Sequence, residues 1–305
     1  MFLKYYGLRE QPFGVTPDPR HLYPSQTHCE ALASLAYGVK SGRGFMALVA
    51  KPGMGKTTLL FQLLEWLRNS AQTVLLSQTQ CDSREFFRYL LADLGFDTRE
   101  HDVVVLHKQF NEVLIRTMHA GKRFVLAIDE AQNLDDSVLE TIRLLSNFET
   151  PRTNLMQIIL AGQPQLAEKL ARPALAQLRQ RISMLIRLNP LTPGETAACI
   201  KHRLRLAGYE GGPLFTPEAL ALITVRSEGI PRNIVNLCFN VLSLGCALER
   251  RIIDEGIVRE VLSDLDVSTL LPGPPGSSRV SEPATLPQVE EKQEEESQTL
   301  SKKEP

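Results

Sequence analysis

Residues 50–58 constrain the fold more than any other stretch of the chain, because they read Ala-Lys-Pro-Gly-Met-Gly-Lys-Thr-Thr. An apolar run at 45–49 comes directly before this stretch, and an apolar helical pattern follows it to about Arg68. A buried strand, a glycine-rich turn and a helix form a phosphate-binding loop, in which backbone N–H groups and the helix start face an anion. The sequence therefore predicts a phosphate site built on this turn.

Individual groups in the loop have distinct predicted roles. Gly53 and Gly55 allow the backbone to curl around a phosphate. We expect Lys56 to reach the β- and γ-phosphates of a nucleotide and the Thr57 hydroxyl to hold Mg²⁺. Ala50 stands where the strict pattern has its first glycine, and a small residue is tolerable there. The candidate nucleotide ligands of the loop are Pro52, Gly53, Met54, Gly55, Lys56, Thr57 and Thr58.

A pair of acidic residues at the end of a second buried strand is the other anchor of the predicted site. The run 124–128 is wholly apolar and is followed by Asp129 and Glu130. We expect Asp129 to hold the water shell of Mg²⁺ and Glu130 to orient and activate a water molecule that attacks the γ-phosphate. The alternative is a pair that only caps a helix start, where acidic residues are favourable. The upstream phosphate loop favours the catalytic interpretation.

Strands and helices alternate through the first two thirds of the chain. Strands are predicted at 45–49, 73–76, 123–128, 155–161 and 183–188, and helices at 25–39, 59–68, 83–94, 103–119, 136–148 and 164–180, the last one broken near Pro173. This alternation predicts an α/β fold with a parallel sheet, helices on both faces and the ligand at the carboxyl ends of the strands. We expect the two motif strands to be neighbours in that sheet, as in phosphate-loop ATPases with an extra central strand.

After Pro190 the pattern becomes purely helical. Thr192-Pro193-Gly194-Glu195 is a capping box that starts a helix, and further helices are expected from Thr216-Pro217, after Gly229-Ile230-Pro231 and from about Asp254. The predicted organisation is an N-terminal arm and helix at 1–43, a phosphate-loop core at 44–190, a small helical lid domain at 191–268 and a tail rich in proline and glutamate at 269–305. The tail has few apolar residues, so we expect it to be disordered.

Composition narrows the class of protein. The chain has 305 residues, of which 43% are hydrophobic and 23% charged, as in an ordinary globular protein. The formal net charge of −1 gives no global attraction to nucleic acid. A local basic face remains an alternative to a solvated helix surface, and it would use Lys201, Arg203, Arg205, Arg250 and Arg251. The sequence shows no membrane span, signal peptide or paired cysteine spacing, so a cytoplasmic location is expected.

The segment before the first strand has two alternative interpretations. Residues 11–19 are stiffened by three prolines and are expected to be extended. Phe13 or Tyr23 could then form a wall against an adenine ring. Alternatively, these aromatic side chains only anchor an N-terminal arm in the core.

With these motifs in order, the chain resembles the AAA+ ATPases, and it is most similar to the group of general secretion pathway protein A, ExeA/GspA. The resemblance covers about residues 1–265. It rests on Tyr6-Gly7-Leu8 with Pro12-Phe13, Pro52-Gly53-Met54-Gly55-Lys56-Thr57-Thr58, Ile128-Asp129-Glu130-Ala131-Gln132, Ala161-Gly162-Gln163-Pro164, Leu178-Arg179-Gln180-Arg181 and Gly229-Ile230-Pro231-Arg232. The transposition ATPases of the MuB and TnsC kind and the origin-recognition ATPases are similar relatives.

The resemblance implies roles for four more residues. Gln163 falls at the polar "sensor 1" position between the two motif strands, with a turn residue as the alternative. Arg179 and Arg181 fall where an arginine finger reaches a neighbouring subunit, although arginine is also favourable at a helix C-terminus. Arg181 is preferred because we expect it just past the helix. Arg232 falls on "sensor 2", and a cation at a helix N-terminus is easier to understand with an anion opposite.

The predicted activity is Mg²⁺-dependent hydrolysis of ATP by a module that drives assembly or remodelling of a partner complex. The resemblance implies a homo-oligomer, ring or filament, with the finger arginine supplied in trans, an unidentified protein partner and a setting in secretion or the cell envelope. Members of that group commonly continue into a membrane span and a peptidoglycan-binding domain, and this chain has an acidic tail instead. The alternative function is a nucleotide-gated DNA-binding regulator in which slow hydrolysis is the off-switch. A metabolic kinase is disfavoured because no acceptor pocket is evident in the sequence.

Overall fold

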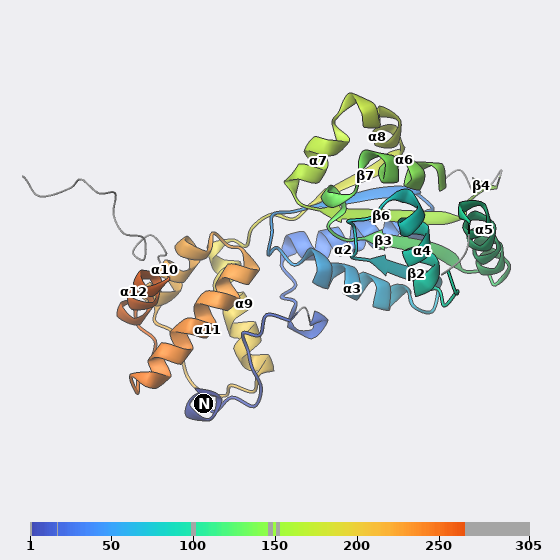
Figure 1. Ribbon diagram of the computed structural model, residues 1–305. Helices are drawn as coiled ribbons and strands as arrows, with labels where there is room; N and C mark the ends of the chain where they lie inside the picture. The colour runs from blue at the N-terminus through green and yellow to red at the C-terminus, as the bar shows by residue number, and fades with distance from the viewer. Residues whose placement is uncertain (1, 17, 99–101, 146–148, 151–152, 266–305) are drawn as a thin grey trace, which may run out of the picture. The chain divides into compact units, whose positions relative to one another are not determined.

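A sheet of five parallel strands is the centre of the computed structural model (Figure 1). In spatial order the strands are β2 (Ala71–Leu76), β3 (Arg123–Ile128), β6 (Met156–Gly162), β1 (Phe45–Val49) and β7 (Ile182–Arg187). Every pair of neighbours is parallel. A short antiparallel pair, β4 (Glu149–Thr150) and β5 (Thr153–Asn154), lies outside this sheet. The predicted α/β class and parallel sheet are confirmed, with small shifts at the strand ends.

The structure describes residues 2–16, 18–98, 102–145, 149–150 and 153–265. The predicted disordered tail at 269–305 lies outside the described residues, as does the end of the helix predicted at 136–148. Among the described helices, none has both the length and the apolar character needed to cross a bilayer. Residues 1–265 belong to one unit by their contacts.

The order of the strands corrects one expectation. Strand β6 pairs with β1 on one side and with β3 on the other, so the two motif strands are not neighbours. In register, Ala47 lies beside Leu160 and Leu126 beside Ile158. All of β6 is buried, as expected for a central strand with both faces covered. Such an order depends on contacts between distant segments, which local apolar patterns do not reveal.

Helices cover both faces of the sheet, because alternate strand residues point to opposite sides. Met46, Leu48 and Val125 pack against α2 (Gln26–Lys40) and α3 (Lys56–Leu67). Phe45, Ala47 and Phe124 belong to the opposite cluster. Its helices are α4 (Ser83–Asp93), α5 (Val103–His119), α6 (Asp136–Leu145), α7 (Pro164–Leu170) and α8 (Ala176–Arg181). Figure 1 shows α2 and α3 on one side of the sheet and α6, α7 and α8 on the other.

A separate apolar cluster holds the C-terminal helices together. These are α9 (Pro193–Leu206), α10 (Pro217–Ser227), α11 (Pro231–Ala247) and α12 (Glu255–Asp264). The predicted capping box is present: the Glu195 N–H donates to the Thr192 hydroxyl at 3.3 Å, and the Thr192 N–H donates to the Glu195 carboxylate at 2.9 Å. This pairing satisfies donors that the first turn of α9 would otherwise leave without partners.

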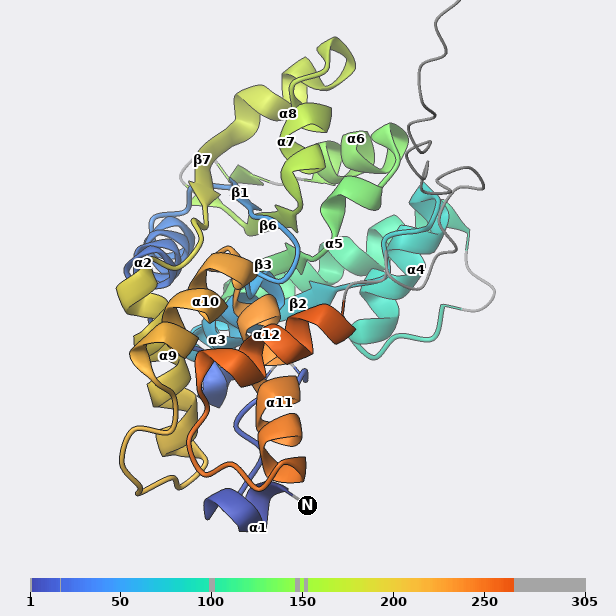
Figure 2. The same ribbon diagram turned by 90° about the vertical axis from the view of Figure 1, so that its left-hand side faces the viewer.

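The N-terminal segment joins this helical cluster; the sequence left core anchoring open as an alternative but did not predict helix α1 or the cluster that it joins. Residues 2–6 form helix α1 (Phe2–Tyr6), and α1 lies at one end of α11 (Figure 2). Phe2 stacks edge-on against Phe239 of α11 with ring centroids 5.7 Å apart. The Tyr6 hydroxyl donates to the backbone oxygen of Arg250 at 3.0 Å. The segment is therefore part of the helical layer by its contacts.

Candidate functional site

The phosphate loop has the backbone shape that its glycines allow. Gly53 has φ +78° and Gly55 has φ +87°, in the left-handed region that side chains disfavour. Gly55 is also the N-cap of α3, so the first N–H groups of that helix open onto the loop. A Cβ at Gly53 would lie only 2.7 Å from the Cβ of Arg232. Both backbone shape and space therefore require glycine at position 53.

Lys56 brings a buried positive charge to the loop. Lys56 is only 5% exposed. Its Nζ donates hydrogen bonds to the carbonyl oxygens of Ala50 at 3.2 Å and Lys51 at 3.5 Å. Burial lowers the pKa of Lys56 from its usual value, although the nearby acidic groups act in the opposite direction. Within the described residues, the hydrogen bonds of Lys56 Nζ go to backbone carbonyls and not to a carboxylate. Such a cation is suited to receive an anion.

Thr57 and Asp129 link the two motifs directly. The Thr57 hydroxyl donates a hydrogen bond to Oδ2 of Asp129, which lies just past the end of β3 and is 3% exposed. Oδ1 of the same carboxylate accepts the backbone N–H of Glu130 at 2.9 Å. A hydroxyl and a carboxylate are the hard oxygen donors that Mg²⁺ prefers. These two residues therefore fit the ion that the loop pattern implies.

Glu130 is held in an unusual backbone conformation beside this pair. Its φ of +51° lies in the left-handed region, which is uncommon for a residue with a side chain. Its Oε2 accepts hydrogen bonds from Nε2 of Gln132 at 2.6 Å and from Nε2 of Gln163 at 3.0 Å. Burial raises the pKa of Glu130, whereas these two hydrogen bonds and the nearby positive charges lower it more. The net pKa is below the usual value, so the side chain is an ionised carboxylate.

Gln132 is a site residue that the sequence analysis missed. Besides its bond to Glu130, its Oε1 accepts the backbone N–H of Gln163 at 3.0 Å. Gln163 follows β6 directly and is the N-cap of α7. The available signal was an amide two residues after a strand-end glutamate, but only the order of the strands shows that Gln132 and Gln163 meet.

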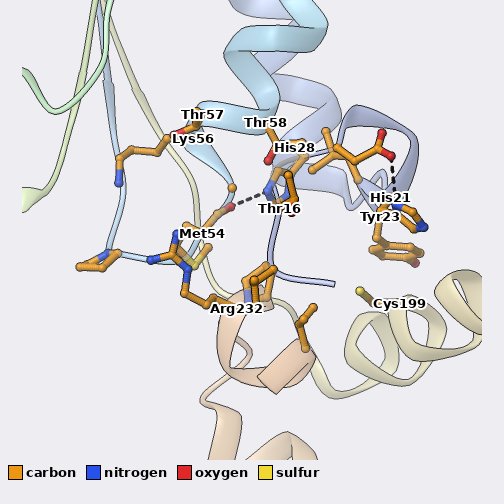
Figure 3. Close-up of a pocket in the computed structure, with 18 of the residues that line it drawn as sticks. Thr16, His21, Tyr23, His28, Met54, Lys56, Thr57, Thr58, Cys199 and Arg232 are labelled. Atoms are coloured by element: carbon orange, nitrogen blue, oxygen red, sulfur yellow. Dashed lines mark hydrogen bonds and ion pairs between the residues drawn. The ribbon is translucent and has the colours of Figure 1, made fainter. Parts of the chain in front are cut away.

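Arg232 enters the site from the start of α11. Its backbone N–H donates to the carbonyl of Gly53 at 3.1 Å, and its exposed side chain extends toward the loop at Met54 (Figure 3). Arg232 lines the same pocket as Lys56, Glu130 and Gln163. The helical region and the phosphate loop therefore meet at this residue.

The other side of the pocket is formed by the N-terminal segment and α9. Thr16, Tyr23, Cys199 and Arg203 line it. Phe13 does not: it is 1% exposed and packs in the apolar cluster of the C-terminal helices. Of the two alternatives, core anchoring therefore describes Phe13, whereas Tyr23, the other aromatic residue considered for the wall, lines the pocket. The burial of Phe13 results from packing against helices that lie far along the chain.

The two candidate finger arginines lie away from the pocket. Arg179 is exposed and donates from Nη1 to the carbonyl of Ala171 at 2.9 Å. Arg181 is half-buried. The pKa of Glu140 is lowered mainly by its hydrogen bond to Arg143, and the positive charge of Arg181 lowers it further. Arg181 is the last residue of α8 rather than just past the helix, because β7 begins at the next residue. Neither arginine is among the residues that line the pocket.

Two of the five residues proposed for a basic face have other partners. Nη1 of Arg203 donates to the carbonyl of Pro12 at 3.2 Å. Arg251 donates to the carbonyl of Tyr5 and lies over the Tyr5 ring, 4.3 Å from its centroid. Both side chains hold the N-terminal segment. The exposed members that remain are Lys201, Arg205 and Arg250.

Comparison with known proteins agrees with this geometry. The sequence model of the AAA domain family matches residues 39–170. Residues 39–170 are an AAA domain. Over 244 residues the chain is 38% identical to general secretion pathway protein A of Aeromonas hydrophila, an alignment that covers 79% of this chain and 44% of that protein. The resemblance inferred from the motifs is confirmed.

A second curated relative is an uncharacterized HTH-type transcriptional regulator of Methanocaldococcus jannaschii. It is 30% identical over 151 residues, which cover 48% of this chain and 36% of that protein. The chain thus spans less than half the length of both curated relatives.

Solved structures show the same fold around the AAA domain. The ORC2 protein of Aeropyrum pernix has a TM-score of 0.65 at 16% identity, with 84% of this chain and 72% of that chain covered. Drosophila ORC bound to DNA has a TM-score of 0.64 at 15% identity, with 88% and 68% covered. The RuvB branch migration motor of Thermotoga maritima has a TM-score of 0.54 at 18% identity, with 82% and 74% covered.

Proposed function

We propose that the chain binds ATP with Mg²⁺ and hydrolyses it, and that this cycle drives the assembly or remodelling of a partner complex. One observation carries the proposal. The Thr57 hydroxyl is bonded to the Asp129 carboxylate, so the phosphate loop and the strand-end acids form a single site beside the buried Lys56. The AAA domain supports a nucleotide as the ligand.

Each side chain has a role that its surroundings support. Lys56 and the loop N–H groups would bind the phosphates, and Thr57 with Asp129 would hold Mg²⁺. When bound, the ion supplies positive charge that neutralises the phosphate oxygens. Arg232 adds a second positive group from the helical side of the pocket. Lys56, the loop N–H groups, the bound ion and Arg232 would thus all favour an anion in the same space.

Glu130 is proposed as the residue that orients and activates water. Its pKa lies below the usual value, so the side chain is ionised at neutral pH and its oxygens are free of a proton. Within the described residues its recorded hydrogen bonds fall on Oε2, which leaves the role of acceptor to Oε1. Gln163 and Gln132 would hold the carboxylate in place, so Gln163 would position Glu130 in addition to the role near the γ-phosphate that the resemblance implies.

An arginine from a neighbouring chain would complete the site. Arg179 and Arg181 both lie outside the pocket of their own chain, which supports a homo-oligomer that contributes one of them in trans. We propose Arg181 as the finger and Arg179 as the alternative. An ATP-trapped Glu130→Gln chain used as bait would identify the protein partner.

A nucleotide titration with matched variants tests the proposal. Lys56→Ala removes the charge on the phosphates and should abolish tight ATP binding in calorimetry. Lys51→Ala is the control, because Lys51 belongs to the same loop but its side chain is exposed, with Nζ 4.0 Å from Oε2 of Glu228. It should bind ATP like the wild type. Equal ATP affinity of wild type and Lys56→Ala would refute the assignment.

A second candidate function is a nucleotide-gated DNA-binding regulator. One similar structure, Drosophila ORC, is bound to DNA, and Lys201, Arg205 and Arg250 are exposed here. If DNA is the partner, it should stimulate phosphate release, and this stimulation should fall steeply with salt. If DNA does not stimulate phosphate release even at low salt, this candidate is excluded and the ATPase proposal stays intact.

A further inference from the structure

We infer that His28 is a positioning residue of the phosphate loop, an inference that rests on the proposed nucleotide binding. His28 lies in the first turn of α2 and is 2% exposed. Its Nε2 is 2.9 Å from the carbonyl oxygen of Met54 (Figure 3), and its Nδ1 is 2.6 Å from the hydroxyl of Ser25. One buried ring thus connects a helix start to the centre of the loop.

The two partners fix which ring nitrogen of His28 carries the proton. A carbonyl oxygen only accepts hydrogen bonds, so Nε2 must donate to Met54. In a neutral ring Nδ1 then has no proton, so it accepts a hydrogen bond from the hydroxyl of Ser25. Burial lowers the pKa of His28, while the bond to Met54 and the charge of Glu195 act in the opposite direction. The ring is therefore neutral and has one donor, which points at the loop.

This donor matters because it fixes the carbonyl oxygen of Met54. The Met54 side chain is buried in the apolar cluster of α2 and α3, and its N–H donates to the carbonyl of Lys51 at 3.4 Å, but among the described residues the one hydrogen bond donated to its carbonyl oxygen comes from His28. Met54 lies between Gly53 and Gly55, which are both in the left-handed region and have no side chains to pack. A peptide between two glycines can rotate readily. If it turned its carbonyl oxygen toward the phosphates, that oxygen would repel them. The bond from His28 holds the carbonyl in one direction and keeps the loop ready for an anion.

The start of α2 is itself anchored to the helical region. Ser25 is the N-cap of α2 and accepts the backbone N–H of His28 at 3.4 Å. The backbone N–H of Gln26 donates to Oε1 of Glu195 at 3.1 Å, and Glu195 belongs to the capping box of α9. His28 thus stands on a helix start that is bonded to α9. The ring has a fixed position from which it can set the orientation of the Met54 peptide.

Two substitutions of different reach test the inference. Glutamine places its amide nitrogen near the position of Nε2, so His28→Gln can still donate to Met54. Asparagine reaches only as far as Nδ1, so His28→Asn can bond Ser25 but not Met54. We expect His28→Asn to weaken both ATP and ADP binding by roughly 5- to 20-fold, the weight of one buried hydrogen bond. His28→Gln should stay within about twofold of the wild type.

The readout is calorimetric affinity together with the melting temperature of the nucleotide-free chain. A purely structural role would lower affinity in both variants in step with their loss of melting temperature. Wild-type affinity in His28→Asn, or equal losses in the two variants, would overturn the inference while the proposed function stands. A wild-type chain that binds no ATP would overturn both, and the first titration would already show it.

A further pair of variants applies if His28→Asn does not fold. Ser25→Ala removes the hydroxyl that orients Nδ1, and it should weaken ATP binding by roughly two- to fivefold. Because Ser25 is also a helix cap, Thr216→Ala is the control: Thr216 caps α10 and accepts the N–H of Ala219 at 3.2 Å. The control should lose stability but keep its affinity. Unchanged affinity in Ser25→Ala would overturn the inference.

Discussion

The pocket has two sides that are built in different ways. On the sheet side, Thr57, Asp129 and Glu130 lie at or near the carboxyl ends of parallel strands and hydrogen-bond to one another or to neighbouring amides. On the helical side, Arg232 and Arg203 come from α11 and α9. The backbone N–H of Arg232 donates to the carbonyl of Gly53, and the Arg203 side chain is hydrogen-bonded to the carbonyl of Pro12 and to Cys199. The sheet side thus has a network of side chains around one carboxylate pair, whereas the two arginines of the helical side are held by separate contacts.

This difference suggests a division of labour. Asp129 at 3% exposure and Lys56 at 5% cannot move without breaking the packing of the sheet. Arg232 is exposed and is tied to the loop through one backbone bond. We therefore propose that the chemistry belongs to the sheet side and the response to bound nucleotide to the helical side.

The largest predicted effect concerns a group that belongs to neither side. If Arg181 completes the sheet side of a neighbouring chain, Arg181→Ala and Lys56→Ala should each be nearly inactive alone. Arginine fingers contribute about 10³–10⁵ in rate in related phosphoryl transfers. Mixing the two variants would pair intact sites with intact fingers, so steady-state phosphate release should partly return. If light scattering shows co-assembly and activity does not return, Arg181 acts within its own chain or only structurally.

A medium effect is predicted for the helical side. Arg232→Ala removes a charged hydrogen-bond donor from the pocket and should weaken ATP binding by roughly 10- to 100-fold. Arg226→Ala is the matched control, because Arg226 is an exposed arginine of α10 outside the pocket. It should titrate like the wild type. Equal affinities for both variants would contradict the role given to Arg232.

The smallest predicted effect tests whether the N-terminal segment supports the helical side without taking part in the chemistry. Tyr6→Phe loses the hydrogen bond to the carbonyl of Arg250. Its free energy of unfolding should fall by about 0.5–1.5 kcal/mol, with kcat unchanged. Tyr37→Phe, at an exposed position of α2, should change less in the same denaturant titration. A large fall in kcat for Tyr6→Phe would show that the two sides are not separable in this way.

The sheet side could be predicted from the sequence, because its motifs are local. A strand, glycines at fixed offsets and a lysine identify the loop, and an apolar run that ends in Asp129 and Glu130 identifies the second strand end. The elements themselves follow from apolar periodicity. The capping box at Thr192 could be read for the same reason, since its partner is three residues away.

The helical side could not be read in the same way, because it depends on contacts across the chain. Phe13 is buried by helices more than 180 residues further on, as the bond from Arg203 to the neighbouring Pro12 illustrates. The position of β6 between the motif strands and the meeting of Gln132 with Gln163 depend on sheet order in the same way. His28 was missed because a histidine in an apolar helix pattern has no local signature of its partner.

We propose that one site binds ATP and hydrolyses it, with Glu130 as the group that activates water. Glu130→Gln keeps the shape of the side chain and removes its ability to accept a proton. We predict that this variant still binds ATP in calorimetry while single-turnover phosphate release slows by roughly 10²–10⁴-fold, the usual weight of a positioned general base. Phosphate release at the wild-type rate from Glu130→Gln would contradict the account.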